Sequence, residues 1–182
     1  MKNDKKIDKT TLVIILYIIQ ELDGILGKTH LQKLLFLINL RAYKKFKIPL
    51  LKLEFEKYKF GPFSYQVDHY INNLETKKYI HSKETTYNGD KKYVRYYCSK
   101  KFANIKEYLS ENIELNSKEI ALLDEVIDSY GSISLRDLLD IVYSLPSVKE
   151  TEYCQPIEVA KKIEEEENYY NSFDEFEELL EQ

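Results

Sequence analysis

The sequence predicts a mainly α fold with a small β component (α+β): a winged helix-turn-helix followed by a C-terminal helical region. Three apolar patterns of helical spacing occupy residues 10–78, and two runs rich in Tyr, Thr, Ile and Val follow at 79–87 and 91–98. Between these runs stands Asn88-Gly89-Asp90, and Asn-Gly is a strong signal for a two-stranded hairpin. Three helices and then a hairpin is the element order of a winged helix, which we prefer to other α+β arrangements.

The first two helices are predicted from their apolar spacing and their ends. The first covers 10–22, with Asp8 or Thr10 as its N-terminal cap and Gly24 just past its end. Its apolar residues cover nearly the whole circumference, which predicts a buried helix. A tight turn leads to the second helix, where Thr29 and Gln32 fit a capping box.

The stretch between the second and third helices has two signals. Leu51, Leu53 and Phe55 alternate with charged residues, as in a half-buried strand. The Gly61-Pro62 pair then breaks regular structure. The third helix is predicted from Ser64 to about residue 78.

Three further helices are predicted in the C-terminal half. One carries an apolar stripe that begins at Phe102, the next opens at Asn116 with Glu119, and the third runs from Ser134 to its stop at Pro146. The third of these either closes the core or forms a dimer seam.

The end of the chain reads as an acidic tail. Residues 147–156 have little pattern and are interpreted as a linker, and two short helices are expected at 156–167 and 172–181. The second of these has an apolar stripe of Phe173, Phe176 and Leu180, which either closes the core or forms a dimer seam. We therefore predict a winged helix-turn-helix over 1–98, a helical extension packed on it over 99–146, and an acidic helical tail over 147–182.

The charge is divided between the two halves of the chain. The 182 residues carry 27 Lys and Arg against 31 Asp and Glu, a net charge of −4. Residues 1–106 hold 22 of these cations and 10 of the anions, or +12, whereas residues 107–182 sum to −16. Such an asymmetry indicates two surfaces with different partners.

Composition also excludes several classes of protein. The longest apolar run, residues 12–19, is much shorter than the roughly 20 residues of a membrane span, and no signal-peptide cleavage site follows it. Cys98 and Cys154 are too few for a disulfide framework. We expect a cytoplasmic protein with reduced thiols and no membrane partner.

The candidate functional residues point to nucleic acid. The third helix stands where a recognition helix would, and its Gln and Asn side chains are suited to pairing with adenine. Lys and Arg along the hairpin are suited to binding phosphates. The competing interpretations are a solvated polar face on a structural helix and lysines that prevent edge-to-edge aggregation. The predicted nucleic-acid-binding residues are Gln66, His69, Asn73, Lys83, Lys91, Lys92 and Arg95, and the predicted partner is double-stranded DNA.

No pattern of residues indicates an enzyme. The sequence has no Gly-rich phosphate loop, no His-x-x-x-His helix and no pair of Cys at zinc spacing. We therefore expect no catalytic residue, no metal and no cofactor.

Three segments resemble a known family, the YwgA-like and Panacea (SocA antitoxin-like) proteins. Residues 27–37, Gly-Lys-Thr-His-Leu-Gln-Lys-Leu-Leu-Phe-Leu, resemble its opening signature, and residues 55–64 resemble its Tyr-x-x-Gly-Pro-[Tyr/Phe]-Ser element. Residues 135–146 are similar to a later helix of the YwgA-like branch. The resemblance, over roughly residues 10–146, implies a winged-helix-like protein of prokaryotic or phage origin. It also implies a role as a regulator, antitoxin or protease adaptor, and it carries over no catalytic residue.

Two functions follow from these observations. The first is a non-enzymatic DNA-binding regulator of transcription, in which the C-terminal helices serve dimerisation or ligand response and a homodimer reads two half-sites. The alternative is a protein-interaction module of the antitoxin, immunity or protease-adaptor type. In that case the acidic helical half binds a partner protein such as a toxin.

Overall fold

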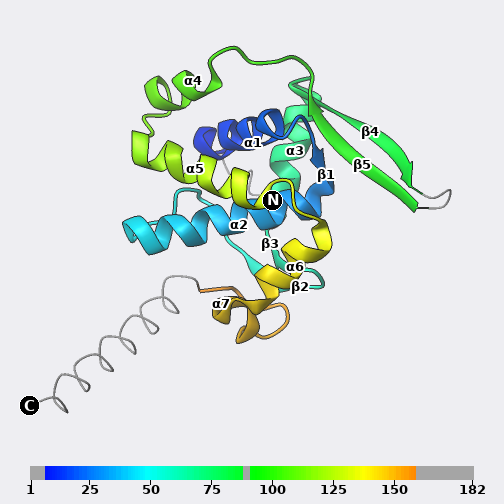
Figure 1. The fold of residues 1–182 in the computed structure, drawn as a ribbon, viewed down its shortest axis with the longest axis vertical. Coiled ribbons are helices and arrows are strands. Elements are labelled where there is room, and N and C mark those ends of the chain that lie inside the picture. The colour runs from blue at the N-terminus through cyan, green and yellow to red at the C-terminus, as the bar shows by residue number, and fades with distance from the viewer. Residues whose placement is uncertain (1–6, 88–90, 159–182) are drawn as a thin grey trace, which may run out of the picture.

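The computed structural model describes residues 7–87 and 91–158, without the side chains of residues 85, 87 and 91. It is mainly α with a small antiparallel β component, as predicted (Figure 1). The elements, in chain order, are α1 (Lys9–Glu21), β1 (Ile25–Leu26), α2 (Gly27–Phe46), β2 (Glu56–Tyr58), β3 (Gly61–Phe63), α3 (Tyr65–Thr76), β4 (Ile80–Tyr87), β5 (Lys91–Cys98), α4 (Ile105–Glu111), α5 (Ser117–Tyr130), α6 (Leu135–Ser144) and α7 (Pro146–Lys149).

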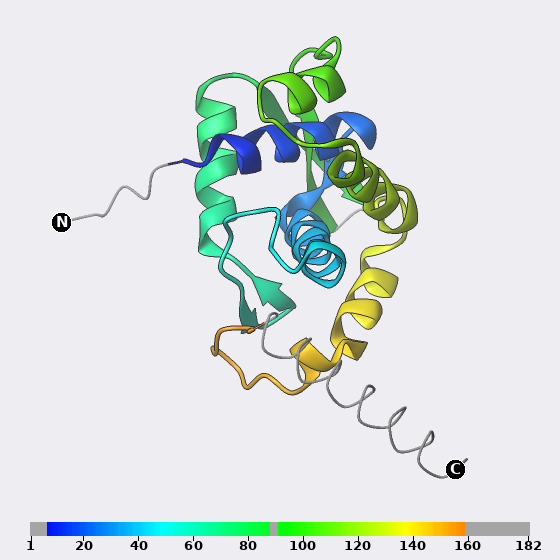
Figure 2. The same cartoon turned by 90° about the vertical axis from the view of Figure 1, so that its left-hand side faces the viewer.

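Helices α1 and α2 form the centre of the molecule. Residues 13–19 of α1 and 30–40 of α2 are all buried, which confirms that the first helix is covered on nearly every side. Figure 2 shows α3 on one side of these two helices and α5 and α6 on the other. Helices α5 and α6 therefore leave the outer face of α3 uncovered, and His69 on that face is exposed.

A hydrogen-bonded cluster links α1 to α5. The buried Tyr17 hydroxyl donates a hydrogen bond to the Asp124 carboxylate, which also accepts one from Lys106 at 2.9 Å. Burial, with the nearby Asp124 carboxylate, raises the pKa of Tyr17 well above its usual range. The phenol therefore stays protonated and keeps donating to Asp124.

The predicted hairpin is confirmed as β4 and β5, and its turn at 88–90 lies outside the described residues. With β1 it makes a three-stranded antiparallel sheet of order β1-β5-β4, in which Ile25 pairs with Tyr96 and Leu26 with Arg95. Helix α2 begins directly after β1, so this edge strand ends there. In Figure 1 the hairpin projects from the helical body.

The predicted strand at Leu51–Phe55 is wrong, although the burial pattern behind it is real. Leu51, Leu53 and Phe55 are buried and the residues between them are exposed, but this stretch pairs with no strand. The amide group of Asn39 takes the place of a partner, since it accepts from Leu51 N at 2.7 Å and donates to Leu51 O at 2.9 Å. Strand pairing begins only at Glu56.

Three of the predicted helix starts are confirmed by their caps and a fourth is wrong. The Ser134 hydroxyl accepts from Asp137 N at the start of α6. Asp8 accepts from Thr11 N at the start of α1, and Asn116 with Glu119 forms a complete capping box at α5. The predicted box of Thr29 with Gln32 does not form, because α2 already begins at Gly27 and has no side-chain cap. The Gln32 side chain is used elsewhere, as described below.

The predicted linker at 147–156 is also wrong. Its first residues form α7, and the chain then runs alongside β2. Cys154 N donates to Lys57 O at 2.8 Å, Lys57 N donates to Gln155 O at 3.0 Å, and Ile157 N donates to Phe55 O at 2.8 Å. These are backbone bonds, which no side-chain periodicity reveals. Of the two helices predicted after the linker, residues 156–158 are not helical and the remainder lies outside the described residues.

Core residues extend from Val13 in α1 to Ile157 beside β2. The predicted region boundaries at residues 98 and 146 stay a prediction. Within the described part of the chain, no helix combines the length and apolar character that would be needed to cross a membrane.

Candidate functional site

The Gly61-Pro62-Phe63-Ser64 bend is held by two neighbouring side chains of α2. The Gln32 carboxamide accepts from Ser64 N at 2.9 Å and donates to Ser64 O at 3.0 Å. The Lys33 ammonium donates to Pro62 O at 2.7 Å. Both side chains are only 1% exposed, and burial lowers the pKa of Lys33 to about 8. The two motifs that carry the family resemblance thus contact each other in the core.

Helix α6 packs next to this bend and presents two apolar stripes. Leu138 and Val142 are fully buried and face the core. Leu135, Leu139 and Tyr143, at spacings of four, form a second stripe that is only partly covered. The Tyr143 hydroxyl donates to Lys59 O at 3.1 Å, which fixes the end of α6 against the β2–β3 turn.

The β4–β5 hairpin supplies an aromatic and basic surface beside α6. Tyr93, Arg95 and Tyr97 alternate along β5 and therefore share one face of the sheet. The Arg95 guanidinium lies 5.9 Å from the centre of the Tyr97 ring, and the His81 ring is stacked on that tyrosine at 5.6 Å. Leu26 of β1 continues this face, because it is paired with Arg95.

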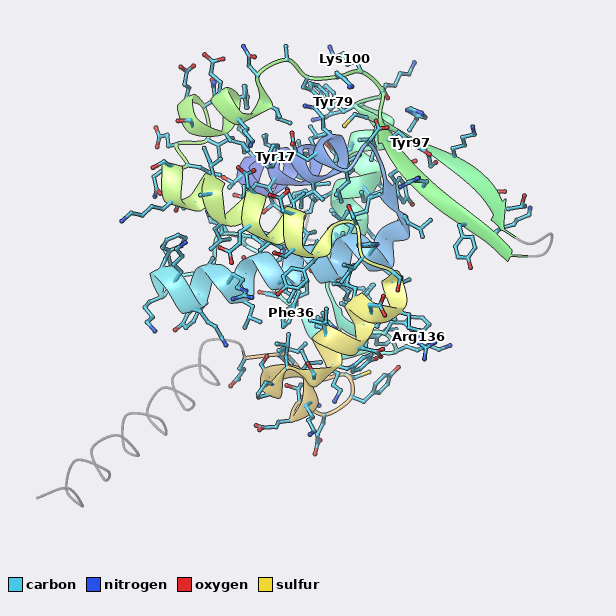
Figure 3. The ribbon with its side chains drawn as sticks, viewed as in Figure 1. Tyr17, Phe36, Tyr79, Tyr97, Lys100 and Arg136 are labelled. Atoms are coloured by element: carbon cyan, nitrogen blue, oxygen red, sulfur yellow. The ribbon has the colours of Figure 1, made fainter. Side chains whose placement is uncertain are left out.

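The two surfaces enclose a groove of about 800 Å³. Residues of β1 and the hairpin form one wall, the second stripe of α6 forms the other, and Arg136 and Asp140 lie along the α6 side. Figure 3 shows Tyr97 on β5 and Arg136 on α6, on the same side of the molecule. We name this feature the hairpin–α6 groove.

The chemistry of the groove suits a protein or peptide ligand. Its lining is mostly Tyr and Leu side chains, with Arg95 and Arg136 as the cations. Tyr and Arg are the residue types most enriched in the energetically dominant parts of protein interfaces. Among the described residues, no three His, Cys, Asp or Glu side chains gather as a metal site.

The structure places the predicted base-reading residues on α3 in unequal settings. Gln66 is used by the neighbouring loop: it accepts from Glu54 N at 3.0 Å and donates to Lys52 O at 3.4 Å. Asn73 is half-buried, and its Oδ1 is buried without a hydrogen-bond partner among the described residues. His69 is exposed. Base reading by these three residues stays a prediction.

The predicted phosphate-binding residues lie on the hairpin. Lys83 and Arg95 are exposed and directly opposite each other across the two strands. Lys92 is exposed and lies 3.5 Å from a Glu84 carboxylate oxygen, and the Lys91 side chain is outside the described set. Phosphate binding by these residues stays a prediction, and Arg95 also lines the hairpin–α6 groove.

The groove itself was missed because the leucines of residues 135–142 read as a single apolar stripe. Leu135, Leu138, Leu139 and Val142 have the i, i+3, i+4, i+7 spacing of one buried face, so the spacing alone does not indicate a second stripe. The facing surface on β5 is predicted from the sequence only as a phosphate-binding surface. Nothing local in the sequence places these two surfaces side by side.

Comparison with known proteins identifies the family. No curated protein matches the chain. A family model described as antitoxin SocA-like, Panacea domain, matches residues 31–147, which run from within α2 through α6 and include Gln32, Lys33 and the Gly61–Ser64 bend that they contact. Since the match spans more than half of the 182 residues, the chain belongs to the antitoxin SocA-like Panacea family.

Proposed function

We propose that this protein is an antitoxin-type module that acts by binding a partner protein, such as a toxin, and not by catalysis. The observation that carries the proposal is the match to the antitoxin SocA-like Panacea domain over residues 31–147. This range contains the helices and the hairpin that form the hairpin–α6 groove.

The hairpin–α6 groove is the proposed partner-binding surface. Tyr93 on the hairpin is 36% exposed and Tyr143 on α6 is 37% exposed, so large apolar side chains from both walls are accessible to a ligand. The groove volume of about 800 Å³ lies within the range of roughly 300–1,000 Å³ that is typical of binding sites. An apolar centre flanked by arginines also matches the usual anatomy of a protein interface.

The test is co-expression with the products of neighbouring genes, scored by growth rescue and by co-purification. Tyr93→Ala and Leu139→Ala should weaken binding and rescue. Tyr108→Ala is the matched control, because Tyr108 is 40% exposed on α4, outside the groove. Equal rescue by all three variants would show that the partner binds outside the groove. If no partner protein co-purifies and no toxin is neutralised, the proposed function is refuted.

A second candidate is a winged-helix DNA-binding regulator that acts as a monomer or a homodimer. It rests on the order α1, β1, α2, α3, β4, β5 and on the sheet order β1-β5-β4, both of which would be expected of a winged helix. The exposed Lys83, Lys92 and Arg95 fit phosphate contacts, whereas the loop contacts of Gln66 compete with base reading.

Titration of duplex DNA at two salt concentrations separates this candidate from the first. If the hairpin holds phosphates, Lys83→Ala should lower the salt slope of binding by about one unit. No binding at either salt concentration would rule out the DNA-binding role.

A further inference from the structure

The hairpin–α6 groove is matched in chemistry by a segment of the same chain. Residues 172–181, beyond the described part, carry Phe173, Phe176 and Leu180 at spacings of three and four. Between and around them the sequence places Asp174, Glu175, Glu177, Glu178 and Glu181. The segment thus pairs large apolar side chains with a dense set of carboxylates.

The charges of the groove are opposite to those of this segment. Strands β4 and β5 carry Lys83, Lys91, Lys92 and Arg95 against Glu84 in sequence, and Arg136 lies on the α6 wall. Asp140 is the acidic residue of the lining. Residues 159–182 hold nine Asp and Glu against two Lys. Attraction between opposite charges therefore favours placing the segment against the hairpin wall.

The described chain also ends close to one end of the groove. Ile157 N donates to Phe55 O, and Pro156 is bridged to Glu56, so the chain leaves the fold beside the start of β2. The other end of β2 leads to Lys59, whose carbonyl accepts the hydroxyl of Tyr143 in the groove wall. A strand of this length covers about 10 Å. Residues 159–171 can span up to roughly 40 Å when extended, which is ample to reach the groove.

We propose that residues 172–181 occupy the hairpin–α6 groove of their own chain. The two phenylalanines and Leu180 pack between the tyrosines of β5 and the second stripe of α6, and the carboxylates face Arg95 and Arg136. Because the segment is tethered, its effective concentration at the groove is in the millimolar range, so weak contacts suffice to fill it. The tail then competes with any other ligand of the groove. This inference rests on the proposed function, because the tail would regulate binding of the partner protein.

The test uses the absence of tryptophan from the chain. In the full-length Phe176→Trp protein the single indole reports on this contact alone. We expect blue-shifted emission and protection from acrylamide quenching. Adding Arg95→Glu with Arg136→Glu should shift the emission to that of a solvated indole and increase quenching several-fold. The control is the same Phe176→Trp protein with Lys77→Glu and Lys118→Glu, two exposed lysines outside the groove that give the same change in net charge.

A second groove variant guards against loss of folding. Leu139→Ser changes a partly exposed position, and it should release the indole while the cooperative unfolding transition is retained. If the Phe176→Trp protein with an unaltered groove shows the emission of a solvated indole, the proposal is overturned. Emission that none of the groove variants changes would also overturn it. A blue shift lost on tenfold dilution would also overturn it, because it would assign the tail to a second copy. These measurements need no toxin, so their failure and the failure of the proposed function are distinguishable.

Discussion

At the scale of single residues, the family motif is held by polar side chains whose partners are backbone groups. Gln32 satisfies both the N–H and the C=O of Ser64 inside the core, where both residues are 1% exposed. The Ser64 hydroxyl lies in the same environment and has no hydrogen-bond partner among the described residues. Substitution of Gln32 and substitution of the neighbouring Ser64 should therefore have different effects on the free energy of unfolding.

Gln32→Ala should lower the free energy of unfolding by about 2–4 kcal/mol, because two buried backbone groups lose their partners. Ser64→Ala should leave it unchanged or raise it slightly, since it removes an unpaired buried hydroxyl. Urea denaturation of both variants and the parent protein checks this pair. A larger loss for Ser64→Ala than for Gln32→Ala would contradict the assignment of the hydrogen bonds.

Lys33 makes stability depend on pH at this same bend. Its pKa in the folded protein is about 8, against 10.5 ordinarily, because burial disfavours the charged ammonium. Between these values the unfolded chain binds more protons than the folded one, so the free energy of unfolding rises with pH. The expected gain from pH 7 to pH 9.5 is about 2 kcal/mol. Urea denaturation at both pH values should show no such gain in Lys33→Met. If the free energies of unfolding of the parent and the variant differ by the same amount at both pH values, the low pKa of Lys33 is refuted.

At the scale of elements, the sequence-based predictions succeeded where the determining contacts are local. Helices α1 to α6 and the β4–β5 hairpin follow from apolar spacing, from caps such as Asp8 and Asn116, and from the Asn-Gly turn. The errors arose where the partner is distant in sequence. Gln32 bonds Ser64 rather than Thr29, and residues 154–157 pair with β2 through backbone atoms alone.

The same reason explains how little of the candidate site was predicted. Arg95 was selected for its charge, and it does line the groove. The sequence leaves open whether the apolar residues of this helix close the core or form a dimer seam, because Leu135 and Leu139 have the spacing of residues that face inward. Only the packing of α6 against α2 and β3, which buries Leu138 and Val142 instead, leaves the other stripe facing the hairpin.

The two stripes of α6 should have separate roles: the buried stripe stabilises the fold, and the partly exposed stripe binds the partner. Leu138→Ala should cost about 2–5 kcal/mol of unfolding free energy, as is typical for a fully buried leucine. Leu139→Ala, at a partly exposed position, should cost less than about 1 kcal/mol but weaken partner binding. Thermal denaturation and titration with the partner measure the two effects. Similar losses of stability in both variants would place Leu139 in the core.

At the scale of the whole molecule, the net charge of −4 conceals an arrangement of opposed surfaces. The acidic helices α5 and α6 lie on the other side of α1 and α2 from α3, so they do not cover it (Figure 2). The basic hairpin projects next to α6 instead (Figure 1). The strongly acidic residues 159–182 follow an exit point beside β2, and this brings them within reach of the hairpin.

If the tail fills the groove, weakening the tail should strengthen partner binding. Full-length protein with Phe173→Ser and Phe176→Ser keeps every charge but loses the apolar side chains that we place between the walls. Its affinity for the partner should rise by up to about tenfold, because a competitor present at millimolar effective concentration has been weakened. Loss of the docked tail should also lower the unfolding free energy, by at most about 1.4 kcal/mol, because a tenfold change in an equilibrium constant corresponds to that free energy. Isothermal titration measures the change in affinity for the double variant, with Tyr169→Ser and Tyr170→Ser as the control that also keeps every charge but lies outside residues 172–181. Weaker binding by the Phe173→Ser and Phe176→Ser protein would mean that the tail contacts the partner directly instead of competing with it.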